Sequence, residues 1–219
     1  MTLRSFLVVT AMLALGACGN QPPVPDWQMN AKAGADRATQ AWLVGDQRVA
    51  VVEFARARRE VASTGRVDLV ARVELTRCAA RVASLDVGPC EGFDALAAGA
   101  APAELAYARY LAGRATAEDA ALLPEPQRPL AGGADAPEAA LAAITDPLSR
   151  LVAAGVLFQR RQATPGVIAQ AVDTASAQGW RRPLLAWLKV QQMRAQAAGA
   201  ADEVARLQRR IDLVAPALP

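Results

Sequence analysis

The side chains of this sequence that are best suited to chemistry are three cysteines and a scatter of carboxylates. The chain has no histidine, so it lacks the commonest general base, the usual serine and cysteine triads and most kinds of zinc site. Two carboxylates that flank a substrate can still cleave a glycosidic bond. The adjacent acidic pairs, Glu118-Asp119 and Asp202-Glu203, fall near predicted helix N-termini, where acids are favoured electrostatically.

Among the other acids, Glu91 and Glu104 are the candidates for a catalytic carboxylate that cleaves glycans. Neither residue is singled out by a neighbouring motif. The sequence contains no Gly-rich phosphate loop, no nucleophile elbow and no metal-ligand spacing. It therefore predicts a protein that is not an enzyme and that has no catalytic residue, metal ion or cofactor.

The first cysteine follows a segment with the order of a secretory signal peptide. Arg4 supplies a positive charge, and the largely apolar run at 6–15 is shorter than the ~20 residues of a membrane-spanning helix. The segment Leu15-Gly16-Ala17-Cys18 then resembles the lipobox of bacterial lipoproteins, with an aliphatic residue, two small residues and the acceptor cysteine. The resemblance implies cleavage between Ala17 and Cys18, loss of residues 1–17, and lipid attachment to Cys18. The alternative is an ordinary cleaved signal in which the cysteine is incidental.

The lipoprotein resemblance also implies a location in the cell and attachment to a membrane. Each buried CH₂ of an acyl chain contributes about 0.8 kcal/mol, so the two or three chains typical of the family hold a protein firmly. Gly19 stands where an aspartate typically retains such proteins in the inner membrane, which implies anchoring to the outer membrane, facing the periplasm. Residues 18–26 would form the lipidated cysteine and an extended, proline-rich tether. The alternative is a disordered arm with no length requirement.

The net charge of the mature chain bears on its possible partners. Removal of residues 1–17, with Arg4, leaves 23 of the 24 basic side chains against 21 acidic ones, a formal charge of +2. So weak an electrostatic field predicts no nucleic-acid partner.

In an oxidising compartment Cys78 and Cys90 are expected to form a disulfide, which would stabilise the fold by roughly 3 kcal/mol. The alternative is one buried and one exposed thiol.

Hydrophobic periodicity predicts an all-α periplasmic domain over residues 27–214, without a sheet. Short connections between helices indicate stacked antiparallel hairpins, as in an irregular α-solenoid or bundle. The expected helices cover residues 27–44, 47–63, 67–85, 103–111, 147–162, 165–178, 181–198 and 201–214. The expected capping residues are Asp26, Thr116 with Asp119, Asp135 with Glu138, Asp146 and Thr164. Prolines predict an irregular segment and a subdomain hinge at 124–134, and residues 215–219 are expected to form a disordered tail.

Gly45, Ala50, Phe54 and Ala57 have the spacing G-x4-A-x3-F-x2-A. This pattern resembles the second-helix half of a tetratricopeptide (TPR) repeat, in which small residues admit the neighbouring helix and the aromatic ring fills a groove. No second copy follows at the 34-residue period of that family. The resemblance implies a TPR-like scaffold for protein contacts. The alternative is ordinary helix packing, because alanines at helical spacing are common in tight bundles.

Adjacent arginines occur at Arg58-Arg59, Arg160-Arg161, Arg181-Arg182 and Arg209-Arg210. They are expected to lie on solvated helix faces, and the alternative is contact with anionic lipid or glycan. Taken together, these patterns predict a lipid-anchored, non-enzymatic helical module that binds an envelope protein during envelope assembly or maintenance. The alternatives are a peptidoglycan-cleaving enzyme and a carrier of an apolar ligand.

Overall fold

The computed structural model describes residues 23–215, and every regular element among them is a helix, which confirms the all-α prediction. The predicted signal segment, Cys18, the first part of the predicted tether and the tail beyond Ala215 lie outside the described residues. Within residues 23–215, no helix is long and apolar enough to cross a bilayer. The α-helices and the 3₁₀ helices (η) are α2 (Asp26–Val44), α3 (Gln47–Ala62), α4 (Val67–Ala83), α5 (Glu91–Asp94), η2 (Ala97–Gly99), α6 (Pro102–Leu111), η3 (Ala117–Leu122), η4 (Glu125–Leu130), α7 (Pro137–Ala143), α8 (Pro147–Gln159), α9 (Pro165–Ala177), α10 (Arg181–Ala197) and α11 (Ala201–Val214).

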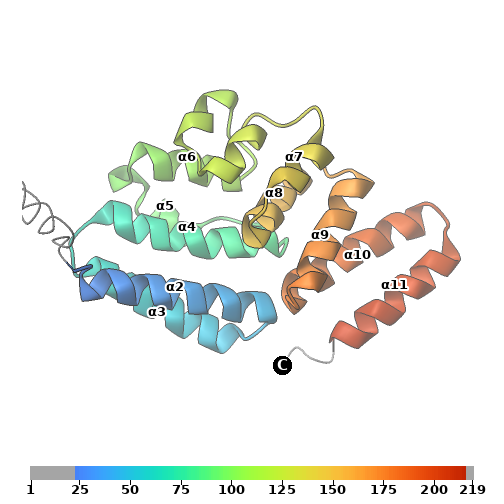
Figure 1. The fold of residues 1–219 in the computed structure, drawn as a ribbon, viewed down its shortest axis with the longest axis horizontal. Coiled ribbons are helices and arrows are strands. Elements are labelled where there is room, and N and C mark those ends of the chain that lie inside the picture. Colours follow the sequence, from blue (N-terminus) through green and yellow to red (C-terminus); the bar gives the residue numbers. More distant parts are fainter. Residues whose placement is uncertain (1–22, 216–219) are drawn as a thin grey trace, which may run out of the picture.

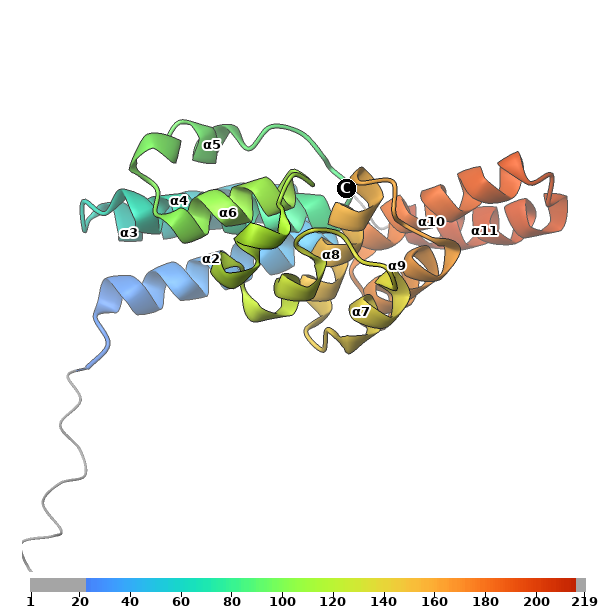
Figure 2. The same ribbon diagram turned by 90° about the horizontal axis from the view of Figure 1, so that it is seen from above.

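The helices are stacked beside one another along the molecule (Figure 1). The α2–α3 hairpin and α4 form one side, α8 and α9 occupy the middle, and the α10–α11 hairpin forms the other side. Figure 2 shows α5, with the segment that leads to it, along one face of the stack and α7 at the opposite face. Because α4 contacts α2, α3, α6 and α8, it is the helix around which the N-terminal half is built.

A close approach between α4 and α8 forms the centre of the core. All residues of α8 from Leu151 to Leu157 are buried, including Gly155. A Cβ atom built on Gly155 would collide with the carbonyl oxygen of Val82 in α4. Glycine is therefore required at this position, because it alone lets the two helix backbones come so close.

The α2–α3 hairpin contains the residues with TPR-like spacing. Gly45 has a φ of 95° and ends α2, as expected of glycine at a helix C-terminus. Ala50, Phe54 and Ala57 are buried on one face of α3. A Cβ atom on Gly34 of α2 would lie 3.3 Å from the Cβ of Ala57, so small residues do let these helices approach closely. Close-packed hairpins of many families share these features, and the TPR likeness stays a prediction.

Two of the predicted helix caps are confirmed by hydrogen bonds. The carboxylate of Asp146 accepts a hydrogen bond from the Ser149 N–H at 2.7 Å and begins α8. The hydroxyl of Thr164 accepts one from the Val167 N–H at 3.2 Å and begins α9. The predicted helix ends are less accurate, since α3, α4 and α8 end at residues 62, 83 and 159 instead of 63, 85 and 162.

Two other predicted caps are wrong. Asp26 is itself the first residue of α2, so it does not occupy the capping position. Asp135 and Glu138 form no capping box, because α7 begins at Pro137 and its capping position falls after Asp135. The carboxylate of Glu138 instead accepts a hydrogen bond from the Thr164 hydroxyl at 2.5 Å, which ties α7 to the start of α9.

The proline-rich segment at 124–134 is more regular than expected, because part of it forms the 3₁₀ helix η4, which contains Pro129. Gln127 of η4 is 2 % exposed. Its side chain accepts a hydrogen bond from the Tyr110 hydroxyl at 2.5 Å and donates one to the Ser149 carbonyl at 3.1 Å. The segment is thus tied to α6 and α8, and the subdomain hinge expected there stays a prediction.

Helix α10 closes the stack by binding the C-terminal end of α2. The last carbonyl groups of a helix have no partner within that helix. Arg181 Nε donates to the carbonyl of Val44 at 3.0 Å, and Arg182 Nε donates to that of Trp42 at 2.8 Å. The Arg182 guanidinium also lies 4.1 Å from the centre of the Trp42 ring, a cation–π geometry. These contacts join parts of the chain that are far apart in sequence.

Tryptophan side chains bind the C-terminal end of α4 in the same region. Trp42 Nε1 of α2 donates to the Ala80 carbonyl at 3.1 Å. Trp187 Nε1 of α10 donates to the Ala83 carbonyl at 3.2 Å. Three helices therefore meet at one place, which we call the α10 junction and define as Trp42, Arg181, Arg182 and Trp187.

Candidate functional site

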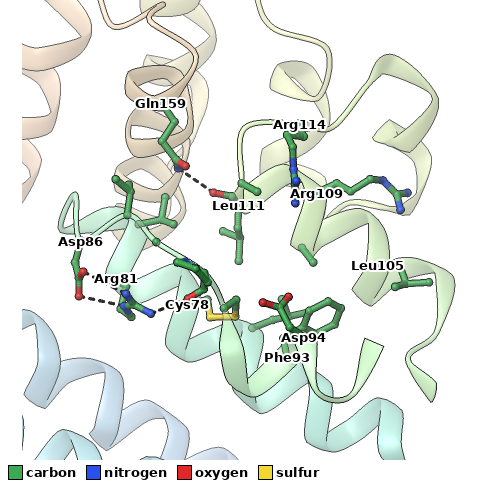
Figure 3. A pocket seen from close by; sticks show the side chains of 18 residues that line it. Cys78, Arg81, Asp86, Phe93, Asp94, Leu105, Arg109, Leu111, Arg114 and Gln159 are labelled. Carbon is green, nitrogen blue, oxygen red and sulfur yellow. Dashed lines mark hydrogen bonds and ion pairs between the residues drawn. A yellow bond between two sulfur atoms is a disulfide. The ribbon is translucent and has the colours of Figure 1, made fainter. Parts of the chain in front are cut away.

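Two pockets adjoin on the molecule where α4, α6, α8 and α10 come together. The first pocket has a volume of about 690 Å³ and is lined by α4, α5, α6 and the connection at 86–90 (Figure 3). The second has a volume of about 740 Å³ and is lined by the end of α8 and by residues of α9 and α10. Because both are lined by Val87, Ala112 and Gln159, they meet at these residues. We call the two together the α4–α10 groove.

The predicted cysteine pair forms part of the wall of the first pocket (Figure 3). Cys78 lies on α4 and Cys90 on the connection to α5, with a Cα–Cα distance of 6.0 Å and their sulfur atoms at disulfide-bonding distance. Phe93 of α5, which is 3 % exposed, lies close to the disulfide and also lines the pocket. The disulfide thus holds α5 and its apolar side chain against α4.

Most charged groups around the first pocket are engaged in ion pairs. Arg81 Nε donates to a carboxylate oxygen of Asp86 at 3.1 Å. Arg109 donates to both carboxylate oxygens of Asp119, which also accepts from the Thr116 N–H at 3.0 Å. The hydrogen bond from Arg109, followed by that from Thr116, lowers the pKa of Asp119. The predicted pairing of Thr116 with Asp119 is thus confirmed, but at the start of the 3₁₀ helix η3.

The ridge between the two pockets is held in place by the end of α8. Gln159 Nε2 donates to the carbonyl of Leu111 at 2.9 Å (Figure 3). Arg160 Nε donates to the carbonyl of Gly113 at 2.9 Å, and another nitrogen of its guanidinium donates to the carbonyl of Ala115. These hydrogen bonds fix the backbone of the loop after α6, which therefore forms a defined edge for both pockets.

The second pocket is mainly apolar. Its apolar side chains include Phe158, Ile168, Val190 and Met193. Met193 is 57 % exposed, and Val87 at the junction of the pockets is 45 % exposed. Large apolar side chains left open to solvent in this way are typical of binding surfaces when they occur together.

The two candidate catalytic acids, Glu91 and Glu104, have different surroundings. Glu104 is 5 % exposed, and one of its oxygens accepts from Arg72 at 2.7 Å while the other has no hydrogen-bond partner among residues 23–215. Glu91 is exposed and lines a smaller cavity of about 240 Å³ together with Glu74. Glu74 in turn accepts from Arg58 at 3.0 Å. The buried acids are therefore parts of ion pairs that connect helices.

The expectation that the arginine pairs lie on solvated helix faces is wrong for three of their members. Arg160 binds carbonyl groups of the loop after α6. Arg181 and Arg182 bind those at the end of α2. The arginines that are exposed, as expected, are Arg58, Arg59, Arg161 and Arg209.

Sequence reasoning missed the groove residues Arg114, Met193 and Arg194. Arg114 lies in a loop, where no periodic pattern marks its surroundings. Met193 and Arg194 follow the predicted apolar stripe of α10, and Met and Arg are both enriched at protein interfaces. An exposed Met-Arg pair next to that stripe was the signal that could have indicated a binding surface.

Replacing both Cys78 and Cys90 by alanine is expected to lower the free energy of unfolding by about 3 kcal/mol, because the disulfide closes a loop with a sequence separation of 12. Urea unfolding followed by circular dichroism measures this loss. Reduction with dithiothreitol should destabilise the unsubstituted protein by a similar amount and leave the double variant unchanged. Equal stability of the two proteins under oxidising conditions would contradict a structural role for the bond.

The chain was compared with models of protein families, with curated proteins and with solved structures, and none of them matches it.

Proposed function

We propose that this protein is a lipid-anchored helical module that binds another envelope protein and performs no chemistry of its own. The observation that supports this most directly is the α4–α10 groove, along which the apolar side chains of Val87 and Met193 are exposed to solvent. Apolar patches with a polar rim are typical of protein-interaction sites. The lipobox-like segment ending at Cys18 supports the location, at the outer membrane and facing the periplasm.

The arrangement of the acids favours binding over glycan cleavage. The carboxylates of Glu74, Glu104 and Asp119 each accept hydrogen bonds from an arginine of another element or turn. Such pairs position helices, whereas glycoside hydrolysis needs two carboxyl groups that face one substrate.

Crosslinking in intact cells at native expression, followed by mass spectrometry, is expected to recover one specific envelope protein. Because a lipid anchor restricts the protein to one membrane surface, the variant Cys18→Ser should lose or change this crosslinked partner. Failure to recover any specific envelope protein from cells with the unsubstituted chain would contradict the proposal.

A second candidate function is supported by the second pocket. Its volume of about 740 Å³ lies within the range of small-molecule sites, and its lining is mainly apolar. A carrier of an apolar ligand would hold lipid after purification, so organic extraction and mass spectrometry of the purified protein distinguishes this function from protein binding.

A further inference from the structure

We infer that the α4–α10 groove binds an acidic, amphipathic segment of the partner protein. This inference rests on the proposed function and adds the chemistry of the partner. Its basis is a combination of an apolar floor, an excess of arginines without ion pairs at the rim, and a backbone that is already fixed in place.

The floor of the groove consists mainly of apolar side chains, most of them almost fully buried, and Val87 and Met193 are exposed along it. The first pocket is lined by Leu75, Phe93, Leu105 and Leu111, and the second by Phe158, Ile168, Val190 and Met193. Met193 has a flexible and polarisable side chain, which can adapt to the shape of a bound peptide. A segment with apolar residues on one side can therefore pack them against Val87, where the pockets meet, and against Met193 in the second pocket.

The rim of the groove has a surplus of positive charge. Arg81 and Arg109 are neutralised by Asp86 and by Asp119, as described above. Of the remaining charged residues that line the two pockets, one is the acid Asp94 and three are arginines that form no ion pair within residues 23–215. These arginines are Arg114 in the first pocket and Arg161 and Arg194 in the second.

Arg161 occupies a backbone position that favours glycine. Its φ is 61°, in the left-handed region, directly after the end of α8. The N–H of Gln162 donates to the Leu157 carbonyl and that of Arg161 to the Phe158 carbonyl, the bonds of a helix ending that usually contains glycine. An arginine at this position costs backbone strain, which is consistent with a function for its exposed side chain.

The distribution of the arginines favours a peptide over a lipid. The headgroup of a lipid presents its charge at one point, whereas Arg114 belongs to one pocket and Arg161 and Arg194 to the other. A peptide can place several carboxylates along its length. The hydrogen bonds from Gln159 and Arg160 to the ridge, together with the disulfide, keep the groove in shape before binding, which lowers the entropy cost of binding.

The test uses the full-length protein in intact cells, with a photoreactive amino acid at Met193 in the groove or, in a separate strain, at exposed Leu213 on α11. We expect irradiation to link position 193 to a protein segment that contains both acidic and apolar residues, as identified by mass spectrometry. The triple variant Arg114→Glu, Arg161→Glu, Arg194→Glu should reduce the yield of this product at least tenfold, because it replaces attraction by repulsion.

The matched control changes the same number of exposed arginines outside the groove. Arg48, Arg56 and Arg209 are exposed and form no ion pair within residues 23–215, so their replacement by glutamate gives the same net charge. This control should leave the yield within about twofold of that of the unsubstituted protein, since charges far from a contact are screened by salt. The single variant Arg161→Gly should lower the yield and leave the melting temperature unchanged or higher, because glycine suits a φ of 61°.

The outcomes separate this inference from the proposed function. A protein linked at position 213 and not at 193 would support a binding module and overturn the groove assignment. A lipid adduct, or a basic or neutral segment, at position 193 would overturn the acidic partner. An equal loss of yield in the two triple variants would also overturn the acidic partner. The absence of any protein product at both positions would contradict the groove assignment and the proposed binding function alike.

Discussion

Replacement of Cys18 by serine is expected to abolish labelling of the protein by palmitate and to move it from the membrane fraction to the soluble fraction of the envelope. Serine lacks the thiol to which the diacylglycerol of a lipoprotein is attached. Each acyl CH₂ contributes about 0.8 kcal/mol to membrane binding, so the loss of two or three chains removes the anchor completely. Metabolic labelling and cell fractionation, with immunodetection, measure both effects.

The control for this experiment is the Cys78→Ala, Cys90→Ala variant, which retains Cys18. It should be labelled by palmitate to the same extent per molecule as the unsubstituted chain, because its two replaced residues are paired with each other in the structure. If Cys18→Ser stays in the membrane fraction, or if the unsubstituted protein takes up no palmitate, lipid anchoring at Cys18 is wrong.

The second large effect is expected from Trp187→Ala, which should lower the free energy of unfolding by about 3–5 kcal/mol. Trp187 is fully buried, and its ring packs edge-on against Phe158 with a centroid distance of 5.9 Å. The substitution leaves a cavity and also removes the hydrogen bond to the Ala83 carbonyl. For a domain of this size the melting temperature should fall by about 10 °C, which differential scanning calorimetry can measure.

Two further variants show which part of the Trp187 effect is due to packing. Trp187→Phe keeps one aromatic ring but loses the donor and part of the indole volume, so it should cost less than Trp187→Ala, with about 1–3 kcal/mol of the loss due to the unpaired Ala83 carbonyl. Trp27→Ala should cost less than half as much as Trp187→Ala, because Trp27 is only partly buried on the smaller apolar cluster of α2, α3 and α4. Equal losses for the two alanine variants would contradict a special role for the α10 junction.

Local signals in the sequence were enough to predict the class of fold and most of its elements. The caps at Asp146 and Thr164 are correct because a capping side chain followed by proline determines a helix start within a few residues. The pairing of Cys78 with Cys90 is confirmed, and it was predicted because these are the two cysteines that remain once Cys18 is assigned to lipid attachment. The Asp135 prediction failed because Pro137 begins α7 later than the pattern indicates.

Interactions between distant residues could not be predicted in this way. Arg182 has the same sequence signal as Arg209, since both belong to pairs of arginines on predicted helices. Arg182 binds the end of α2, but Arg209 is exposed, and only the three-dimensional packing distinguishes them. The α4–α10 groove depends on the same kind of information, because its lining comes from segments between residues 75 and 197. For this reason the sequence predicted a helical binding module without locating its binding surface.

The α10 junction has a consequence for how the chain folds and for how it can evolve. Its hydrogen bonds from Arg181 and Arg182 join residues that are 137 and 140 positions apart. During folding the end of α2 therefore gains these hydrogen bonds only when a segment from much later in the chain packs beside it, and such distant contacts form slowly. Open helical arrays can gain or lose a unit at either end, whereas removal of α10 from this chain would also remove the hydrogen bonds that Arg181 and Arg182 donate to the end of its first hairpin.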